Sequence, residues 1–385
     1  MATVTFGRVE QISSGEIETL DPRRSIDIEH KQQVVAEFLE VHDYEALLLQ
    51  QPHNFSWFTT GGDNSRGGGQ HPIASLFIAP ESRVLLADNV DSGQMFDREV
   101  PGLGFLSKER PWHESKMTLI EDLCRSRRVA SDTGFRQTDN VSSQLSKLRT
   151  PLTEYERERI RDLGRLVAHA VEATARTFGH GQTEAEIAGQ LSHRLIKAGV
   201  LPERLQVWAD GQGHRYRHWS YGNDAVERYC TLSAVGRRDG LCAGCSRTIS
   251  FGDPPEVAQT AHRRALLMQA TGMCFSIANW QLYETWSRVQ RIYEKFGYPE
   301  EWQLTDQGSI IGYDVCEELI TPDSQYRLQP GTAVFWHPSV GPDLVSDTIL
   351  VSEQGSKLLT RMEDWPKVKI DIKGAPILRP DILKR

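Results

Sequence analysis

The stretch Asp306-Gln-Gly-Ser-Ile-Ile-Gly-Tyr-Asp-Val-Cys-Glu-Glu318 decides the fold of this chain. Gly308 and Gly312 let the backbone pass close to another segment, and the residues around them predict two short extended pieces. The reactive side chains of this stretch are a hydroxyl, a phenol, a thiol and two carboxylates, on Ser309, Tyr313, Cys316, Glu317 and Glu318.

Two further segments complete this half of the chain. Residues 331–338, Gly-Thr-Ala-Val-Phe-Trp-His-Pro, form an apolar run that predicts a strand ending in the imidazole of His337. The runs 344–351 and 355–359 are separated by a turn and predict a closing hairpin.

This order of pieces resembles the pita-bread superfamily (peptidase family M24), which holds methionine and X-Pro aminopeptidases, prolidase and creatinase. In the metallopeptidases of that fold the stretch runs G-H-x-[IL]-G-x-x-x-H-E, a later strand ends in E-P, and the last strand carries E-D. The chain keeps the frame of these motifs at Gly308, Gly312, Glu317, Pro338 and Asp347.

The metal-binding positions of the resemblance hold other residues. The two aspartate positions, the histidine position and the two glutamate positions fall on Ser233, Gly244, Ser309, His337 and Ser346. The second histidine of the G-x-x-x-H-E motif falls on Cys316. A divalent ion bridged by carboxylates needs several charged oxygens, which these residues do not supply. We therefore expect no metal and no other cofactor, despite the fold.

Composition limits the class of protein. The 385 residues suffice for two domains, and 39% hydrophobic with 25% charged residues is usual for a globular protein. A net charge of -8 argues against nucleic acid as a partner. No apolar run reaches the length of a membrane helix, and the first residues lack a secretory pattern. Six scattered cysteines then favour reduced thiols and a cytoplasmic location.

The first part of the chain predicts an alternating α/β unit. Residues 1–26 are polar and predict an extended arm, and residues 28–42 have the apolar spacing of an amphipathic helix. Three short apolar runs predict strands, and a helix and a fourth strand follow, at 46–50, 73–78, 83–87, 113–124 and 128–131. The unit is similar to the N-terminal domain of creatinase and prolidase, whose N-x-x-[YW]-x-[TS]-G element fits Asn54, Trp57, Thr60 and Gly61.

A glycine-rich loop follows that element at residues 61–70. Its composition alone predicts a surface loop. In creatinase, the matching loop carries an arginine that reaches a bound carboxylate across a dimer interface, and Arg66 is the candidate for that role here. The resemblance therefore implies a homodimer that binds a small-molecule substrate.

The second part of the chain predicts helices that cover a sheet. Thr153 with Glu156, and Thr183 with Glu186, have the spacing of capping boxes at the starts of two helices. Residues 256–296 predict a third helical region. We predict an α+β protein, with a creatinase-like α/β domain over residues 1–148 and a pita-bread domain over residues 149–385.

Three classes of function stay open. The first is a metal-independent enzyme like creatinase, acting on a small amino-acid, amide or guanidino substrate. The lone-histidine position of the superfamily falls on His218, with His214 as the alternative, and imidazole changes charge near neutral pH. Glu317 and His337 are expected to line the same pocket. The residues expected to bind substrate are Arg66, Ser233, Arg247, Ser309, Tyr313 and Ser346.

The other two classes are a binding scaffold and a thiol or soft-metal site. Eukaryotic chromatin and growth-related members of the superfamily use this fold without its metal ligands. Cys242 and Cys245 form a C-x-x-C pair, and Cys316 and His337 are expected near the same pocket, so a Cys/His metal site is conceivable. Cys316 is also a candidate nucleophile, activated by His337 or His218.

Unassigned bacterial members of the superfamily resemble this chain more fully. They carry H-Q-G-G-x-x-G-Y-x-x-R-E where this chain has residues 306–317, and W-N-P-S near a final E-D-T. The chain departs from them at Asp306, Cys316, His337 and Ser346, all in the expected pocket. Because the changes gather there while the frame is kept, we favour a changed chemistry over a lost one.

Overall fold

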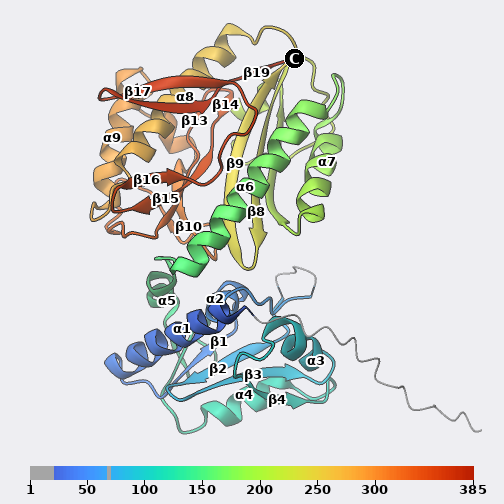
Figure 1. Ribbon diagram of the computed structural model, residues 1–385, viewed down its shortest axis with the longest axis vertical. Helices are drawn as coiled ribbons and strands as arrows, with labels where there is room; N and C mark the ends of the chain where they lie inside the picture. The colour runs from blue at the N-terminus through green and yellow to red at the C-terminus, as the bar shows by residue number, and fades with distance from the viewer. Residues whose placement is uncertain (1–20, 67–70) are drawn as a thin grey trace, which may run out of the picture.

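The computed structural model describes residues 21–66 and 71–385. Their two largest sheets are connected by helix α5 (Ser142–Arg149) (Figure 1). Most of the predicted arm lies outside the described residues. Residues 22–26 of that arm belong instead to helix α1 (Pro22–Val41), which begins six residues before the predicted start at Ile28. The Asp21 carboxylate caps this helix by accepting the N–H of Arg23, and Pro22 suits a first helical position.

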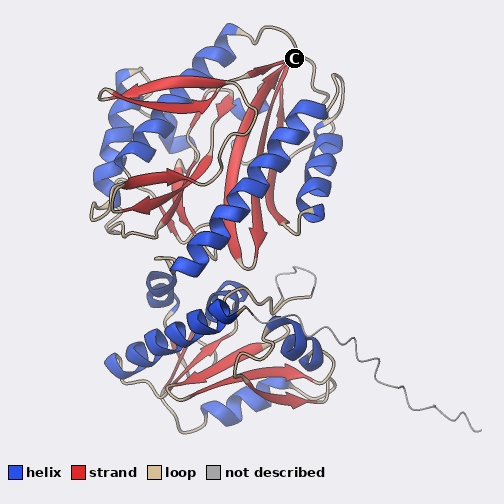
Figure 2. Ribbon diagram, in the orientation of Figure 1, coloured by secondary structure: helices blue, strands red, loops and turns tan. Residues whose placement is uncertain are grey.

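The N-terminal sheet has the strand order β4-β3-β2-β1-β5-β6. The predicted strands and the helix after them are confirmed, while the Asn54 element forms a short helix. The bounds are β1 (Ala46–Leu49), α2 (Pro52–Phe58), β2 (Ser75–Ala79), β3 (Ser82–Asp88), α3 (Ser92–Gln94), a π-helical turn (Met95–Glu99), β4 (Leu106–Arg110), α4 (Lys116–Cys124), β5 (Val129–Ser131) and β6 (Asp139–Asn140). Figure 2 shows α1 and α4 on opposite faces of this sheet.

The C-terminal sheet has the strand order β11-β10-β12-β15-β9-β8-β7. Its long antiparallel strands are β7 (Leu201–Ala209), β8 (Tyr229–Arg238) and β9 (Leu241–Ser250). Its shorter strands are β10 (Gly308–Ile311), β11 (Glu318–Leu319), β12 (Ala333–Trp336), β15 (Asp347–Ser352), β16 (Gly355–Leu358) and β19 (Leu383–Lys384). Two separate two-stranded sheets are formed by β13 (Ser339–Val340) with β14 (Asp343–Leu344) and by β17 (Lys367–Ile372) with β18 (Ala375–Pro380). The two extended pieces and the closing hairpin are confirmed as β10, β11, β15 and β16.

Helices cover this sheet. Both capping boxes are present, at the starts of α6 (Glu154–Thr177) and α7 (Glu184–Lys197). The third helical region is two helices rather than one, α8 (Glu256–Phe275) and α9 (Leu282–Lys295). Asn279 has a left-handed backbone with φ of 71°, which a continuous helix cannot contain. The predicted α+β class is confirmed.

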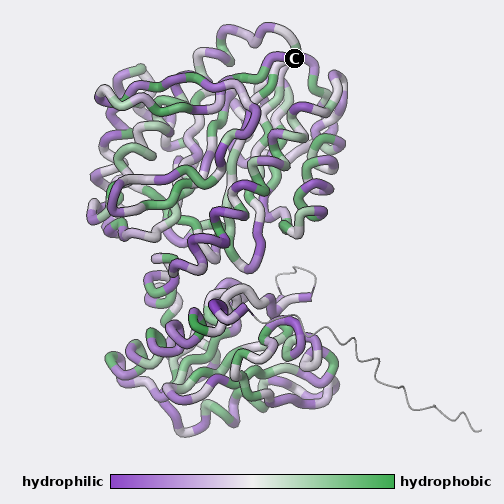
Figure 3. The backbone as a smooth tube through the Cα atoms, viewed as in Figure 1, coloured by the Kyte–Doolittle hydropathy of each residue, from purple (hydrophilic) through white to green (hydrophobic). Residues whose placement is uncertain are grey.

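An apolar core holds the elements together. One cluster of buried side chains runs from α1 and β1 through α6 to β8 and β9, and includes Val35, Leu47, Val167, Leu232 and Ile249. In Figure 3, hydrophilic and hydrophobic residues alternate along the helices that cover the sheets. Within the described residues, each helix is too short or too polar to cross a membrane.

Gly308 has the close approach that the sequence predicts. A Cβ on this residue would lie 3.0 Å from the Trp336 ring and 3.1 Å from the Ile320 side chain. The pairing of Gly308 with Trp336 brings β10 against β12, and His337 follows directly after β12. The segment before β10 and the end of β12 therefore meet, which positions the site.

Candidate active site

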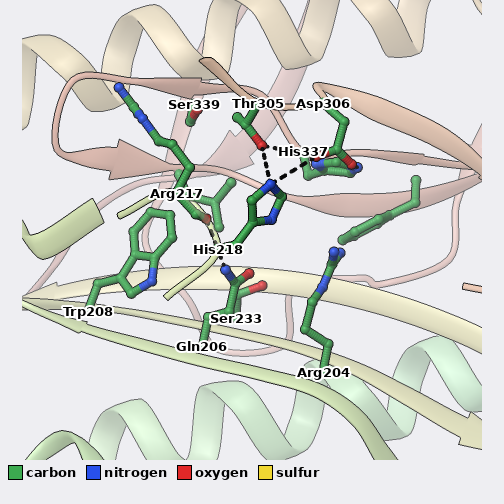
Figure 4. Close-up of a pocket in the computed structure, with 12 residues that line it drawn as sticks. Arg204, Gln206, Trp208, Arg217, His218, Ser233, Thr305, Asp306, His337 and Ser339 are labelled. Carbon is green, nitrogen blue, oxygen red and sulfur yellow. Dashed lines mark hydrogen bonds and ion pairs between the residues drawn. The ribbon is translucent and has the colours of Figure 1, made fainter. Parts of the chain in front are cut away.

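A small cavity lies between the long strands and the segment that precedes β10. Arg204, Gln206 and Trp208 of β7 line one wall, and Asp306 and His337 line the opposite wall. Its volume is about 20 Å³, which is room for about one water molecule. Figure 4 shows His218 in the middle, with Trp208 and Arg217 on one side and Arg204 and His337 on the other.

Asp306 lies between two imidazoles. Its Oδ1 is 3.9 Å from Nε2 of His218, and its Oδ2 is 3.5 Å from Nε2 of His337. The Thr305 hydroxyl lies 3.3 Å from Nε2 of His218 and donates to Asp306 over 2.9 Å. The two histidines differ in solvent access, because the His218 side chain is 69% exposed and that of His337 only 8%. The cavity thus has one histidine at its mouth and one inside.

Burial and nearby charges set the protonation states of His337 and Asp306. Full burial lowers the pKa of His337 to about 4, against the opposing effect of Asp306, so this imidazole is neutral at neutral pH. Burial raises the pKa of Asp306, but His337, the Thr305 hydroxyl and Arg204 together outweigh it, so this pKa lies below its ordinary value. Asp306 is therefore an ionised carboxylate between the two rings.

The loop that carries His218 is held by buried polar groups. Glu184 accepts hydrogen bonds from the Trp219 indole over 2.8 Å and from the backbone N–H of Gly222 over 2.7 Å. The Trp208 indole donates to the Trp219 carbonyl over 2.8 Å, and the Gln206 amide donates to the Arg217 carbonyl over 3.2 Å. Backbone groups on both sides of His218 are thus fixed.

Three buried polar atoms around the cavity have no protein partner. They are Nε of Arg204, Nε of Arg217 and Oγ of Ser339, and all three residues line the cavity. Buried polar groups in proteins are nearly always hydrogen-bonded to protein or water, so these three atoms are positioned to bond a water molecule or a polar group that enters the cavity. The Arg204 guanidinium also lies 5.7 Å from the centre of the Phe335 ring.

Comparison with known proteins identifies the family. The model of metallopeptidase family M24 matches residues 158–363, more than half of the chain. The chain belongs to metallopeptidase family M24. It is 22% identical over 347 residues to an uncharacterized peptidase of Staphylococcus haemolyticus, covering 84% of this chain and 97% of that protein.

Solved structures share the fold. The prolidase of Pyrococcus horikoshii has a TM-score of 0.74 at 18% identity, covering 89% of this chain and 99% of its own. The N-terminal domain of the FACT complex subunit SPT16 from chickpea (Cicer arietinum) has a TM-score of 0.68 at 10% identity, covering 88% and 96%. At such low sequence identities, these comparisons show a shared fold alone.

The family's metal does not fit the residues of this M24 chain. A Cβ on Gly244 would come within 3.0 Å of the Phe335 ring, 2.9 Å of the Ala234 carbonyl and 2.8 Å of the Val235 side chain. Phe335 thus fills the space into which a second aspartate would project. Ser309 and Ser346 are buried but carry no charge. Across residues 21–66 and 71–385, His, Cys, Asp and Glu side chains form no cluster of three that fits a metal.

Two residues expected in the pocket instead join the domains. The Glu317 side chain is fully buried and pairs with Arg149, which donates from Nε to Oε1 over 2.9 Å. Tyr313 donates its hydroxyl over 2.6 Å to Glu156, which also pairs with Lys31 of α1. Neither Glu317 nor Tyr313 lines the cavity, so the structure does not bring them to the site where catalysis and substrate binding were predicted for them.

Three further predicted site residues are buried in the sheet. Arg247 donates to Glu172 over 2.9 Å and to Asp347 over 3.1 Å, with its side chain fully enclosed. Ser309 and Ser346 are each at most 2% exposed and do not line the cavity. The substrate-binding roles predicted for these three residues are therefore not supported, whereas Ser233 lines the cavity as expected.

The predicted loop arginine and thiols also lie elsewhere. Arg66 makes a two-pronged ion pair with Asp91 of its own chain, over 3.0 and 2.7 Å, and its side chain is 64% exposed. Cys316 is an exposed residue that does not line the cavity. Its thiol is nevertheless partly enclosed by neighbouring atoms, and this desolvation, with the charges of Asp314 and Asp306, raises its pKa to about 11. That shift opposes a thiolate nucleophile.

The C-x-x-C pair does not form a joint site. Cys242 and Cys245 are buried free thiols, and burial raises the pKa of Cys242 well above its ordinary value and that of Cys245 to about 12. Charged neighbours of Cys242 include Arg237 and Glu203, whereas those of Cys245 include Arg247. The two thiols thus face different surroundings, and the Cys/His metal site is not assembled.

Sequence reasoning assigned no role to several residues of this site. Asp306 was visible only as a departure from the bacterial members, and Arg204 and Arg217 belong to no motif. Glu184 lies in the G-x-T-E segment at the start of α7, but the contact of its carboxylate with the His218 loop spans 35 residues. No local pattern could have predicted that contact.

Proposed function

We propose that this chain is a metal-independent hydrolase that cleaves a C–N bond in a small substrate derived from an amino acid, with His218 as acid and base. The observation that carries the proposal is the position of Asp306 between His218 and His337 in a cavity bordered by unpartnered polar atoms. Membership of a peptidase family supports hydrolysis as the reaction class. No step uses a metal, because the residues do not fit one.

His218 has the surroundings of a general base. A proton on Nε2 faces Asp306 and the Thr305 hydroxyl, which leaves the lone pair of Nδ1 to accept a proton from water. The water oxygen then forms a bond to the carbonyl or amidine carbon of the substrate. As the C–N bond breaks, His218 returns the proton to the leaving nitrogen. The Asp306 carboxylate stabilises the imidazolium between the two steps.

The arginines and the buried hydroxyl would hold the substrate. Arg204 lines the pocket, and its buried Nε has no protein partner. A guanidinium suits the planar carboxylate of an amino acid. Ser339 offers an unpartnered hydroxyl on the opposite wall. A substrate with a free carboxylate next to the scissile nitrogen matches this arrangement.

A matched pair of substitutions tests the proposal. His218→Asn keeps approximate volume and removes the titrating group, whereas His214→Asn makes the same change at the alternative position on the same loop. We expect His218→Asn to abolish hydrolysis of amide and guanidino derivatives of amino acids, with the melting temperature changed by about 2 °C or less, because the side chain is exposed. Full activity in His218→Asn together with loss in His214→Asn would refute the assignment.

A binding scaffold is the second candidate function. The volume of about 20 Å³ leaves no room for a substrate in this conformation, and Phe335 fills one ligand position. The fold is also shared with a domain of the FACT complex subunit SPT16. If no amide or guanidino substrate is turned over and small acids do not raise the melting temperature, the scaffold function is favoured.

A further inference from the structure

A larger cavity, here termed the outer groove, adjoins the candidate site on the other side of the His218 loop. Its volume is about 700 Å³, within the usual range for ligand pockets. Its walls are residues 210–214, the first turns of α8, and residues 340–342. Val340 follows directly after Ser339, which lines the small cavity, so the two spaces share a wall.

One ion pair separates the two spaces. Arg217 lines the small cavity, and it donates to Glu301 over 2.6 Å and to the Gly341 carbonyl over 2.8 Å. Glu301 and Gly341 line the outer groove. The side chains of this pair are only 7% and 15% exposed, and the pair joins a residue that lines the small cavity to one that lines the outer groove. A ligand too large for the small cavity can extend into the outer groove if this pair separates.

The surface of the outer groove favours an apolar occupant. Two of its three carboxylates are already engaged, because Asp210 accepts the backbone N–H groups of residues 227–229 and Glu301 accepts from Arg217. The third, Glu256, is exposed at the first residue of α8. Arg264 donates to the Tyr298 hydroxyl. The remaining wall includes Val257, Ala258, Ala261, Val340 and Pro342. Val257 is 70% exposed, which leaves apolar surface for a ligand to cover.

We infer that the outer groove binds the apolar acyl chain of an N-acylated amino acid. This inference rests on the proposed function, because it places the carboxylate at Arg204 and the amide beside His218. Binding therefore widens the small cavity beyond its present volume of about 20 Å³. Figure 4 shows Arg204 and Arg217 on opposite sides of His218. The acyl chain then passes Arg217 and enters the outer groove. Entry separates Arg217 from Glu301.

Calorimetric titration with two probes of different chain length tests the inference. On the full chain we expect N-decanoylglycine to bind about 100-fold more tightly than N-acetylglycine, the factor given by burial of about four methylene groups. Thr260→Trp fills the outer groove, and Val257→Asp places a charge on its exposed wall; each should reduce the advantage of the longer probe at least tenfold. Binding of N-acetylglycine should not change. Ile196→Asp, an exposed apolar position on α7, is the matched control.

The outcomes separate this inference from the proposed function. Equal affinities for the two probes, no binding of either, or an unchanged advantage in Val257→Asp would overturn the groove inference. If hydrolysis survives in His218→Asn while the chain-length advantage is lost in Val257→Asp, the mechanism fails and the groove stands. Val257→Asp gives a readout even if Thr260→Trp does not fold, because Val257 is exposed.

Discussion

Replacement of Glu317 by glutamine distinguishes a structural role from a catalytic one. Its side chain is fully buried, pairs with Arg149, and accepts hydrogen bonds from the Asp314 N–H over 3.0 Å and from Ser146 over 3.2 Å. Breaking a buried ion pair costs about 3–5 kcal/mol, because the remaining charge stays unpaired. An unfolding entropy of about 2.1 cal/mol/K per residue, over 385 residues, converts this cost to a melting temperature lower by about 4–6 °C.

The direction of the Glu317 pKa predicts how a double variant behaves. Burial raises this pKa, and the opposing effect of Arg149 does not cancel it, so the pair is stabilised less than its short contacts suggest. Arg149→Met with Glu317→Leu should therefore lose less stability than the sum of the two single changes. Thermal unfolding followed by circular dichroism measures each variant, with the less buried neighbour Glu318→Gln as control.

The activity of the same variant decides the role. We expect Glu317→Gln to keep whatever hydrolysis or probe binding the wild-type protein shows, measured well below its melting temperature. A melting temperature within about 1 °C of wild type, combined with lost activity, would refute the structural role and restore Glu317 as a catalytic residue.

Three further predictions concern metal content, pH and assembly. Elemental analysis should find no stoichiometric transition metal, because Ser233, Gly244 and Ser309 offer no charged ligand; about one ion per chain, lost in His337→Ala, would contradict this. His262 is buried between Asp343 (2.8 Å) and the Pro380 carbonyl (3.0 Å), and although burial lowers its pKa, Asp343 raises it to a net value above 6.5. Its stabilisation is therefore complete below about pH 6.5 and is lost as the pH rises through the folded-state pKa, so the melting temperature of wild type should fall over that window and that of His262→Gln should not. Light scattering at micromolar concentration should show a homodimer, and a monomer would remove the role predicted for Arg66 at a partner's pocket.

The helices and strands of this fold could be predicted from residues that are close together in the sequence. The capping boxes at Thr153 and Thr183 are each complete within four consecutive residues, so their side chains meet as soon as the helix forms. Gly308 and the apolar runs of β12 and β15 likewise predict strands and a close approach from neighbouring residues alone. The family resemblance rests on the same short motifs, which is why the fold was predictable.

Tertiary packing decided which polar residues share a site. The stretch from Asp306 to Glu318 places its carboxylates in two different environments: Asp306 meets His218, 88 residues away, whereas Glu317 meets Arg149, 168 residues away. The partner of a charged group is set by where distant elements pack, and burial then sets its pKa. Neither the partner of a charged group nor its pKa follows from spacing in the sequence. The strands and helices could therefore be predicted, whereas the residues that line the cavity could be found only from the structure.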